Sequence, residues 1–587
     1  MSTKKLTSFL LFLVIASASC MGQNSSVTKN ESKILSFQEG LKNVPIDEAN
    51  KKIVFSVPPF IDLTKITPSI KVSDGATLSP ASDTEQDFSK PFVYTVTAAD
   101  GSKNTYTVIA SKREGGPSGG LPPQISKAKP MTNVSLTFDP SKFTAQTQEF
   151  QGKSIKVRAY ERVIYVANPA DAGQEVLNIY VPEEYFNGGS INGYTATTAP
   201  IFFPNKVGGY MPAQPATFMP QSGGGPGGPP SAAVVMALSK GYVVASAGAR
   251  GRTSPTGKAP AGIVDLKAAI RYLKFNDKNM AGDANKIISN GTSAGGAMSS
   301  LLGATGNHPD YEPFLKAIGA ANATDDVFAV SAYCPISNLE NADMAYEWQL
   351  NKIRDYKGRG GAGTLNEAAI KVSDDLKKAF PNYLNGLNLK NNEGKKLSLE
   401  ANGEGNFKDL VNSYIVASAQ KALDSGIDLS KYGFLKINTN KVSAVDFDNY
   451  MIYLEHMKTP PAFDALDNKS FENSLFGNET IENRHFTSYA FQNAKDTKPL
   501  MADAQQIKMM NPMSYIGDKT AKTAKHWRVR HGAKDRDTGF AVPVILATTL
   551  KNKGFNIDFV LPWDKPHSGD YDLDELFGWV DKIVRGE

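Results

Sequence analysis

A serine stands at the centre of a short glycine-flanked segment, residues 290–295, which reads Asn-Gly-Thr-Ser-Ala-Gly. The segment follows the apolar pair Ile287 and Ile288. A Gly-x-Ser-x-Gly pattern at the end of a strand is typical of a sharp strand-to-helix turn, because the two glycines leave the turn the room it needs. Such a turn exposes the serine hydroxyl and directs the first amides of the next helix towards it. The pattern therefore predicts that Ser293 is a nucleophile, although it is common by chance in a chain with 50 glycines.

A nucleophilic serine needs a base, and the base needs a carboxylate that holds its tautomer. In enzymes with this turn the order along the chain is serine, acid, histidine, each at the end of a strand. Of the six histidines, only His567 lies in a loop between a late strand-like run (557–561) and a final helical segment (573–584). We therefore predict that His567 is the base; the alternative is a histidine of an ordinary surface loop.

The acid should follow the strand that precedes the histidine strand. After the strand-like residues 527–532 come Asp535, Arg536 and Asp537. Spacing alone fits Asp535 and Asp537 equally well. The alternative for either is a helix N-cap, since the chain from Phe540 onward has a helical pattern.

An acyl-transfer site also needs two backbone N–H groups that bind the oxyanion. One is the amide of Ala294, directly after the serine. The second should come from the loop after the strand-like residues 200–203, where Val-Gly-Gly-Tyr stands at 207–210. A glycine pair there lets the backbone approach the intermediate, whereas the alternative is a plain glycine turn.

Strands and helices alternate from about residue 131 to the end, as these motifs require. Residues 176–181, 200–203 and 242–247 have strand composition, and the apolar residues of 263–273 recur at helical spacing. This alternation predicts a parallel sheet with helices on both faces, and hence the α/β-hydrolase fold. Between about 345 and 500 the chain is polar and largely helical in pattern, which predicts a cap inserted over the active edge of the sheet.

The chain has 587 residues, which is more than one hydrophobic core usually holds. Residues 34–110 contain short strand-like runs and an Asp-Gly hairpin signal at 100–101, and they resemble the immunoglobulin-like modules of exported bacterial lipoproteins. We expect this module to be a spacer; carbohydrate binding is the alternative. The predicted divisions are a leader (1–20), a tether (21–32), an Ig-like β-sandwich (33–112), a Gly/Pro-rich linker (113–130) and a hydrolase domain (131–587).

The first residues have the pattern of a signal for export. Lys4 and Lys5 precede the apolar residues 9–16, and small residues follow up to Cys20. The end of the leader resembles a lipoprotein box with Ser17 in place of the usual leucine. We therefore predict export, either as a lipoprotein that is lipidated at Cys20 and held at the bacterial cell envelope or surface, or by ordinary cleavage as a periplasmic or secreted protein.

Several classes of function are disfavoured by composition. A net charge of +5 without a basic block gives no sign of nucleic-acid binding. The two cysteines are Cys20 and Cys334, so we expect no disulfide and a buried structural thiol at Cys334. Asp570, Asp572 and Asp574 are better explained by the start of the last helix than by a cation site. The predicted chemistry needs no metal and no cofactor.

Longer motifs are similar to one enzyme family, the bacterial tannases or tannin acyl hydrolases. The resemblance covers about residues 150–587 and does not include the β-rich N-terminal module. It is carried by Gly-Gly-Tyr at 208–210, the serine segment at 291–295, Ala-Tyr-Cys-Pro-Ile at 332–336, Ala-Asp-Met-Ala-Tyr-Glu-Trp at 342–348 and Pro-His-Ser-Gly-Asp-Tyr-Asp at 566–572.

The resemblance assigns roles to individual residues. It implies a triad of Ser293, Asp535 and His567, which decides between the two candidate acids. It implies that Gly209 and Ala294 supply the oxyanion amides. It further implies that the hydroxyls of a galloyl ring are bound by Lys458, Glu472 and Asp537.

That ring-binding set is chemically reasonable, because gallate presents three adjacent phenolic hydroxyls. Each hydroxyl can donate to a carboxylate and accept from an ammonium group, and such charge-assisted hydrogen bonds are the strong ones. The leading hypothesis is therefore hydrolysis of galloyl esters and tannins. A feruloyl or general phenolic esterase is the alternative enzyme, and a non-catalytic surface binding protein is the alternative of another class.

Overall fold

The computed structural model describes residues 31–39, 42–44, 46–57, 63–112, 132–219, 231–358 and 361–587. The predicted leader with Cys20, nearly all of the tether and the linker 113–130 lie outside these residues. The chain divides into two compact units, Met1–Gln124 and Ile125–Glu587, which are described separately below. Within the described parts, no helix is both long and apolar enough to span a bilayer.

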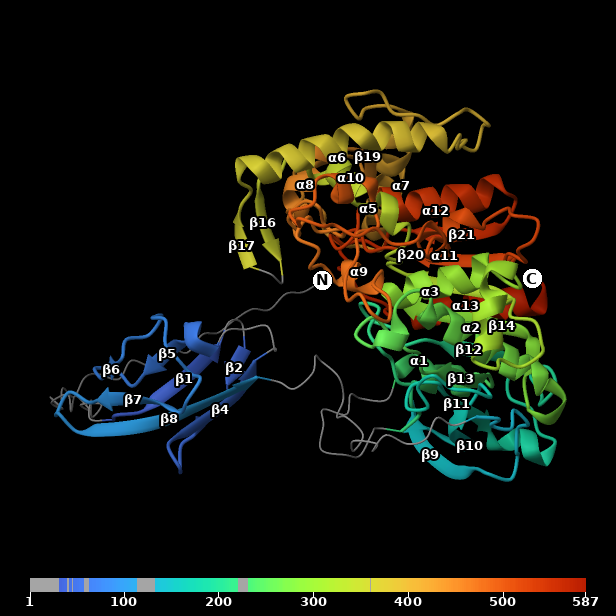
Figure 1. Ribbon diagram of the computed structural model, residues 1–587, viewed down its shortest axis with the longest axis horizontal. Helices are drawn as coiled ribbons and strands as arrows, with labels where there is room; N and C mark the ends of the chain where they lie inside the picture. Colours follow the sequence, from blue (N-terminus) through green and yellow to red (C-terminus); the bar gives the residue numbers. More distant parts are fainter. Residues whose placement is uncertain are drawn as a thin grey trace, which may run out of the picture. The chain divides into compact units, whose positions relative to one another are not determined.

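Two sheets form the N-terminal unit (Figure 1). The first has the strand order β2-β1-β5 and the second the order β3-β4-β8-β7-β6. Phe37 of the first sheet contacts Phe55 and Tyr94 of the second, with ring centroids 5.7 and 6.4 Å apart, so one apolar core lies between the sheets. The predicted small all-β module is therefore confirmed. Its strands are β1 (Ile34–Glu39), β2 (Lys42–Val44), β3 (Ile46–Asp47), β4 (Lys52–Val57), β5 (Ser69–Val72), β6 (Thr77–Ser79), β7 (Phe92–Thr97) and β8 (Lys103–Lys112).

A nine-stranded sheet is the centre of the second unit, with the order β21-β20-β15-β14-β12-β13-β11-β10-β9. The strands from β13 to β21 in this order pair in parallel. Every residue of β12, β13 and β15 is buried, as expected for parallel strands covered on both faces. The strands are β9 (Thr144–Phe150), β10 (Lys153–Ile164), β11 (Val176–Pro182), β12 (Pro200–Pro204), β13 (Val243–Ala247), β14 (Asp283–Thr292), β15 (Ala329–Tyr333), β20 (His526–Arg530) and β21 (Asn556–Val560).

The sheet differs from the predicted all-parallel one at its β9 edge. There β9, β10 and β11 pair antiparallel, and β11 joins β13 antiparallel as well. The sequence pattern did not indicate β9 and β10, because most of their residues are exposed or half-buried and form no continuous apolar run. The α/β-hydrolase prediction itself is confirmed, with a mixed rather than a parallel sheet.

Helices flank this sheet and connect its strands (Figure 1). The glycine-rich turn after β14 leads directly into α3, and the last helix, α13, follows the loop after β21. The helices around the sheet are α1 (Ala232–Ser239), α2 (Ala261–Phe275), α3 (Ala294–Ala304), α4 (Glu312–Ala317), α12 (Ala541–Asn552) and α13 (Leu573–Arg585).

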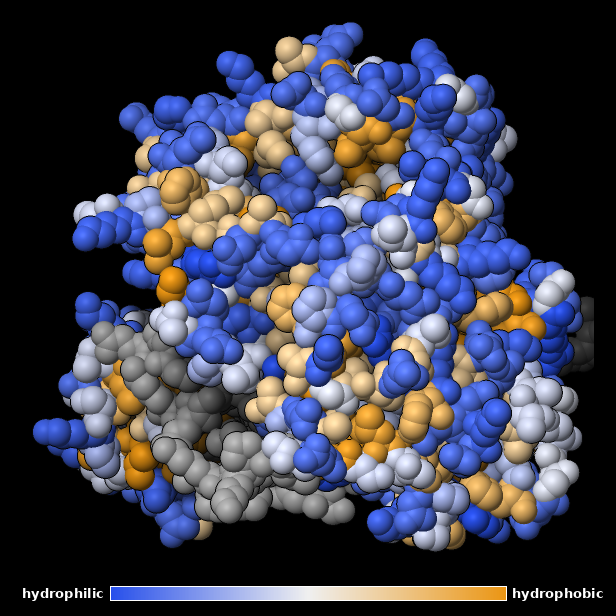
Figure 2. Space-filling model, turned by 45° about the vertical axis from the view of Figure 1, so that its right-hand side comes forward, coloured by the Kyte–Doolittle hydropathy of each residue, from blue (hydrophilic) through white to orange (hydrophobic). Residues whose placement is uncertain are grey.

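The long segment between β15 and β20 lies on one side of the sheet, with α6 at its outer surface (Figure 1). It is mainly helical, as predicted, but it also contains two short hairpins, β16–β17 and β18–β19, which the polar pattern did not indicate. On the face shown in Figure 2, hydrophobic residues form small groups among hydrophilic ones. The elements are α5 (Leu339–Leu350), β16 (Asp355–Gly358), β17 (Gly361–Thr364), α6 (Glu367–Gly386), α7 (Asn406–Asp424), β18 (Leu435–Asn438), β19 (Lys441–Val445), α8 (Phe447–Leu454), α9 (Phe471–Leu475), α10 (Ser488–Gln492) and α11 (Ala504–Met509).

Candidate active site

Ser293 occupies the turn between β14 and α3, in the conformation that the sequence pattern predicts. Its backbone has φ 63° and ψ −124°, a strained region for a residue with a side chain. The turn is held from both sides, since the Ser293 N–H donates to the Tyr333 carbonyl (2.9 Å) and the Ser293 carbonyl accepts from the Ile336 N–H (3.3 Å). The Ser293 side chain remains partly exposed at the edge of the sheet.

The two glycines of the turn are required by close contacts. A Cβ on Gly291 would lie 2.3 Å from the Gly295 carbonyl oxygen, and one on Gly295 would lie 2.7 Å from the Asn205 side-chain oxygen. Asn205 follows β12, and its side-chain amide donates to the Gly295 carbonyl at 3.0 Å and to the Asn290 carbonyl at 3.1 Å. Asn205 thus joins the loop after β12 to the serine turn, a role that its place in the sequence did not indicate.

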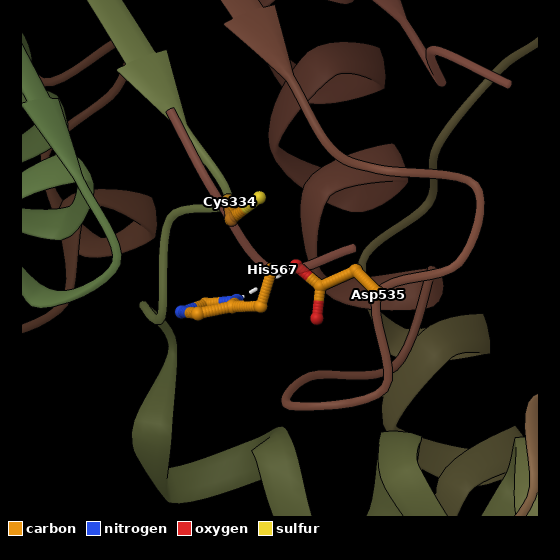
Figure 3. A group of neighbouring side chains, drawn as sticks. All are labelled: Cys334, Asp535 and His567. Carbon is orange, nitrogen blue, oxygen red and sulfur yellow. Dashed lines mark hydrogen bonds and ion pairs between the residues drawn. The ribbon is translucent and has the colours of Figure 1, made fainter. Parts of the chain in front are cut away.

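His567 and Asp535 are joined by a short hydrogen bond between Nδ1 and Oδ2, at 2.7 Å (Figure 3). The second oxygen of Asp535 accepts the Asp537 N–H at 2.8 Å, and the Asp535 side chain is fully buried. Within the described residues, neither the Ser293 hydroxyl nor His567 Nε2 makes a hydrogen bond, so both are free for a substrate and for each other. The structure therefore pairs His567 with Asp535 rather than with Asp537, whose Oδ2 lies 3.9 Å from the same nitrogen.

The loop that carries His567 is docked on the serine turn. Asn290 Nδ2 donates to Asp570 Oδ1 at 3.1 Å, and a Cβ on Gly569 would come within 1.9 Å of the Thr292 hydroxyl oxygen. Asp572, which begins α13, accepts the Tyr333 hydroxyl at 2.6 Å. The three strand ends that carry the predicted serine, acid and histidine therefore meet at one place.

Two further groups lie beside the Asp535 carboxylate. Cys334 is a buried free thiol. Its Sγ lies within 4.8 Å of a carboxylate oxygen of Asp535 and of a ring nitrogen of His567 (Figure 3). The Cys334 thiol donates to the Ser568 carbonyl at 3.4 Å, next to His567. The buried His531 has its Nδ1 3.8 Å from Asp535 Oδ2. The buried thiol was predicted, but its place beside the acid was not, because residue 334 and residue 535 belong to separate strand ends.

The charges around Asp535 and His567 favour the ionised form of the Asp535 carboxylate and the protonated form of the His567 imidazole. Burial lowers the pKa of His567, but the hydrogen bond that His567 donates to Asp535 and the charges of Asp535 and Asp537 outweigh burial, and the pKa is raised. Burial alone would raise the pKa of Asp535; the neighbouring histidines instead hold it well below its usual range. Asp535 therefore stays ionised while His567 gains and loses a proton.

Two backbone amides, those of Gly209 and Ala294, are the candidates for an oxyanion site. Ala294 is the first residue of α3, where the helix has no internal partner for its N–H groups. Gly209 has φ +55°, and its N–H makes no hydrogen bond within the described residues. Its loop is held on the serine turn, since a Cβ on Gly295 would lie 2.8 Å from the Val207 carbonyl oxygen. Within the described residues, the two N–H groups that were predicted to bind an oxyanion are therefore without a hydrogen-bond partner.

Of the three residues expected to bind a ring, Asp537 and Lys458 lie beside each other near His567, and the charge of Glu472 interacts with both of them. Lys458 Nζ donates to the Asp537 carbonyl at 2.7 Å and lies 3.9 Å from Asp537 Oδ1. Glu472 is partly buried, and within the described residues its carboxylate forms no hydrogen bond or ion pair. Burial raises the pKa of Glu472, against the opposing charges of Lys458 and Arg252. Within the described residues, the carboxylate of Glu472 is thus left without a hydrogen-bond or ion-pair partner, whereas Lys458 and Asp537 are already paired with each other.

The cap segments that carry Lys458 and Glu472 are fixed by buried aspartates. Asp343 of α5 accepts the N–H groups of Phe463 and Asp464 at 2.7 and 3.1 Å. Asp464 in turn accepts the side-chain amide of Asn473 in α9 at 2.7 Å. Burial and the charge of Asp464 raise the pKa of Asp343 to about 7. This chain of contacts gives a structural reason for Asp343 in the Ala-Asp-Met-Ala-Tyr-Glu-Trp motif.

Tyr346 of the same motif joins the cap to the loop of the acid. Its hydroxyl donates to the Arg536 carbonyl at 3.0 Å and accepts the Met457 N–H at 3.2 Å. Lys458 and Asp537, the neighbours of these two residues, are thereby held together.

Comparisons with solved structures identify the second unit. A tannin acyl hydrolase from Lactobacillus plantarum is 48% identical, and the match has a TM-score of 0.74 and covers 76% of this chain and 99% of that one. A tannase from Fusobacterium nucleatum is 49% identical, with a TM-score of 0.73 and coverage of 77% and 99%. The chain belongs to the tannase family. A further tannin acyl hydrolase structure, in complex with ethyl gallate, is 48% identical with a TM-score of 0.73, and covers 76% of this chain and 99% of its own.

Other comparisons add to the tannase assignment. The family model described as BD-FAE matches residues 228–383, and the one described as SGBP, N-terminal matches residues 34–110. Two esterases of Mycobacterium tuberculosis, LipC and LipQ, are 37% identical over 79 residues and 32% identical over 97 residues. These stretches cover 14% and 16% of this chain, and the chain spans only 19% and 22% of the length of those two relatives. The match to the tannases, in contrast, covers nearly all of their chains.

Proposed function

We propose that this chain hydrolyses galloyl esters, both simple gallates and tannins, through an acyl-serine intermediate. One observation carries the proposal: two groups that can bind ring hydroxyls lie beside His567, the histidine that is hydrogen-bonded to Asp535. Asp537 Oδ2 lies 3.9 Å from His567 Nδ1, and Lys458 Nζ lies 3.9 Å from Asp537 Oδ1. A ring bound there places its carboxyl ester near Ser293. The names of the solved relatives, and the ethyl gallate bound to one of them, support the same substrate class.

The reaction uses the groups in a fixed order. Ser293 Oγ attacks the ester carbonyl carbon while His567 Nε2 takes the hydroxyl proton, and the N–H groups of Gly209 and Ala294 bind the oxyanion. The bond to the alcohol then breaks, and His567 returns the proton to the leaving oxygen. Water repeats the sequence on the acyl-serine and releases gallate. Asp535 keeps His567 in the tautomer that accepts a proton at Nε2 throughout.

The closest alternative substrate is a feruloyl ester, which has a propenoyl spacer and a methoxy group. It cannot satisfy all three polar side chains, and an unmatched buried polar group costs about 1–3 kcal/mol. We therefore expect kcat/KM for methyl gallate to exceed that for methyl ferulate by about 10- to 100-fold or more. Faster cleavage of methyl ferulate in the same assay would overturn the proposal.

Replacing Glu472 with alanine tests whether this preference comes from the ring site. Glu472→Ala should reduce kcat/KM for methyl gallate by about 10- to 100-fold and leave p-nitrophenyl benzoate, whose ring is bare, much less affected. Glu479→Ala, at an exposed position shortly after α9, is the matched control and should change neither rate. An equal loss on both esters in Glu472→Ala would mean that Glu472 does not bind the ring.

We further propose that the protein is exported and anchored by lipid at Cys20. The basic and apolar residues of the leader and the position of Cys20 support this, and free periplasmic or secreted protein is the alternative. Metabolic labelling with a fatty acid tests it: label that persists in Cys20→Ser would exclude this anchor.

A further inference from the structure

Arg252 is a buried arginine that is tied to the loop of the oxyanion site. It lies shortly after β13 and is only 9% exposed. Its Nε donates to the Gly209 carbonyl at 2.7 Å, and its backbone N–H donates to the Tyr210 carbonyl at 2.8 Å. These two bonds fix the base of its guanidinium beside the residue whose amide is expected to bind the oxyanion.

The outer part of this guanidinium has no hydrogen-bond or carboxylate partner in the described residues. No carboxylate oxygen lies within 4 Å of it, and its Nη N–H groups make no hydrogen bond there. Burial lowers the pKa of Arg252, and the charges of Glu472 and Glu482 only partly offset burial. The Nη atoms are not among the fully buried unpaired atoms, so they lie at the solvent-facing edge of the site, where they can donate to the oxygen of a ligand.

An exposed aromatic ring covers the other face of Arg252. The guanidinium carbon lies 4.3 Å from the centre of the Phe471 ring. Phe471 is 56% exposed, although it directly precedes the ring-binding candidate Glu472. Only the Arg252 guanidinium separates the Phe471 ring from the Gly209 carbonyl, so this aromatic surface lies at the rim of the proposed site.

Both groups are held in place before any ligand binds. Phe471 is the first residue of α9, whose start is closed by a capping box between Ser470 and Asn473. The same helix is attached to the segment after β13, because the Ser474 hydroxyl donates to the Arg252 carbonyl at 3.3 Å. A rigid aromatic platform loses little conformational entropy on binding, which favours its use as a contact.

We propose that Phe471 and Arg252 form a subsite for a second aromatic ring, in ester substrates that carry more than one galloyl group. The second ring stacks on the face of Phe471 that Arg252 leaves open, and the Arg252 Nη groups donate to oxygens of the ester linkage between the two rings. The inference rests on the proposed function and narrows it, from galloyl esters in general to a preference for multiply galloylated ones.

A matched pair of substrates tests the subsite. Ethylene glycol digallate presents two galloyl rings, whereas ethylene glycol monogallate presents one ring on the same alcohol. Wild-type enzyme should show the higher kcat/KM for the digallate through a lower KM. Phe471→Ala should reduce the ratio of the two kcat/KM values by about five- to tenfold, as expected for the loss of one stacked ring. Phe491→Ala, at another exposed aromatic position of the cap, is the control and should leave the ratio unchanged.

A second variant keeps the test decisive if the first one alters α9. Arg252→Gln should lower the digallate-to-monogallate ratio of kcat/KM. Phe471→Tyr, which keeps an aromatic face at position 471, should keep the ratio of the wild-type enzyme. Equal ratios in wild type, Phe471→Ala and Arg252→Gln would overturn the subsite while leaving galloyl ester hydrolysis intact. Failure of wild-type enzyme to cleave even the monogallate would instead overturn the proposed function, and the subsite with it.

Discussion

Ser293→Ala is expected to lower kcat for methyl gallate by about 10⁴- to 10⁶-fold, the range typical for loss of a serine nucleophile. The Ser293 hydroxyl makes no hydrogen bond within the described residues, so its removal leaves no buried partner unsatisfied. The positive φ of residue 293 is as strained for alanine as for serine, because both have a Cβ. The loss should therefore be chemical, and the thermal unfolding midpoint should stay within a few degrees of that of wild type.

The matched control for this variant is Ser300→Ala in α3, the helix that follows Ser293. The Ser300 hydroxyl donates to the Gly296 carbonyl at 2.9 Å, within α3, and takes no part in the proposed reaction. This control should keep most of the wild-type kcat. Undiminished turnover by Ser293→Ala, measured on enzyme that unfolds like wild type, would exclude the acyl-serine mechanism.

Ser293 and His567 could be singled out as candidates from the sequence because each has a local signal. The glycines around Ser293 meet backbone atoms of the same turn, and His567 lies between a strand and the last helix, β21 and α13. Spacing left the acid open, since Asp535 and Asp537 belong to one short loop. The structure distinguishes the two by their contacts. The buried Asp535 carboxylate is hydrogen-bonded to His567, whereas the Asp537 carboxylate lies beside Lys458.

Other parts of the site have no local signal. Asn205 is a single polar residue after β12, and its importance comes from a turn some 85 residues further along the chain. In the sequence, Arg252 is a single basic residue in a loop. Its contacts with Gly209 and Phe471 form only in the folded structure. Asp343 acts on the ring-binding residues through Asp464, a contact across 121 positions. Such long-range contacts follow from the docking of the cap on the sheet, which periodicity and spacing do not specify.

The residues proposed to select the substrate lie close to the residues proposed to carry out the reaction. Asp537 donates its backbone N–H to the Asp535 carboxylate, while its own carboxylate lies between His567 and Lys458. A ring hydroxyl that binds Asp537 is thus bound two residues away from the proposed catalytic acid, Asp535. Changes to Asp537 should therefore affect substrate choice and the base together, whereas changes to Asp535 should affect the base alone.

Asp535→Asn provides the test of this separation, with an expected loss in kcat of about 10⁴-fold on every ester. An asparagine presents an N–H or a neutral carbonyl to His567 Nδ1, so the tautomer with a free Nε2 lone pair is no longer enforced. Removal of the negative charge also lowers the pKa of His567, which Asp535 raises in the wild type. Because only unprotonated His567 can accept the serine proton, activity rises with pH through this pKa, and the acid limb of kcat/KM should move to lower pH in the variant.

Asp537→Asn is the matched variant, since it removes the same charge two residues away. Its carboxylate lies 3.9 Å from His567 Nδ1, against 2.7 Å for Asp535, so its effect on the pKa of His567 should be the smaller of the two. On p-nitrophenyl acetate, which has no ring on its acyl group, Asp537→Asn should lose far less than Asp535→Asn. On methyl gallate it should lose a further 10- to 100-fold or so through ring binding. If Asp537→Asn proved the more damaging change on p-nitrophenyl acetate, the acid of the triad would be Asp537, and the choice between the two aspartates would have to be reversed.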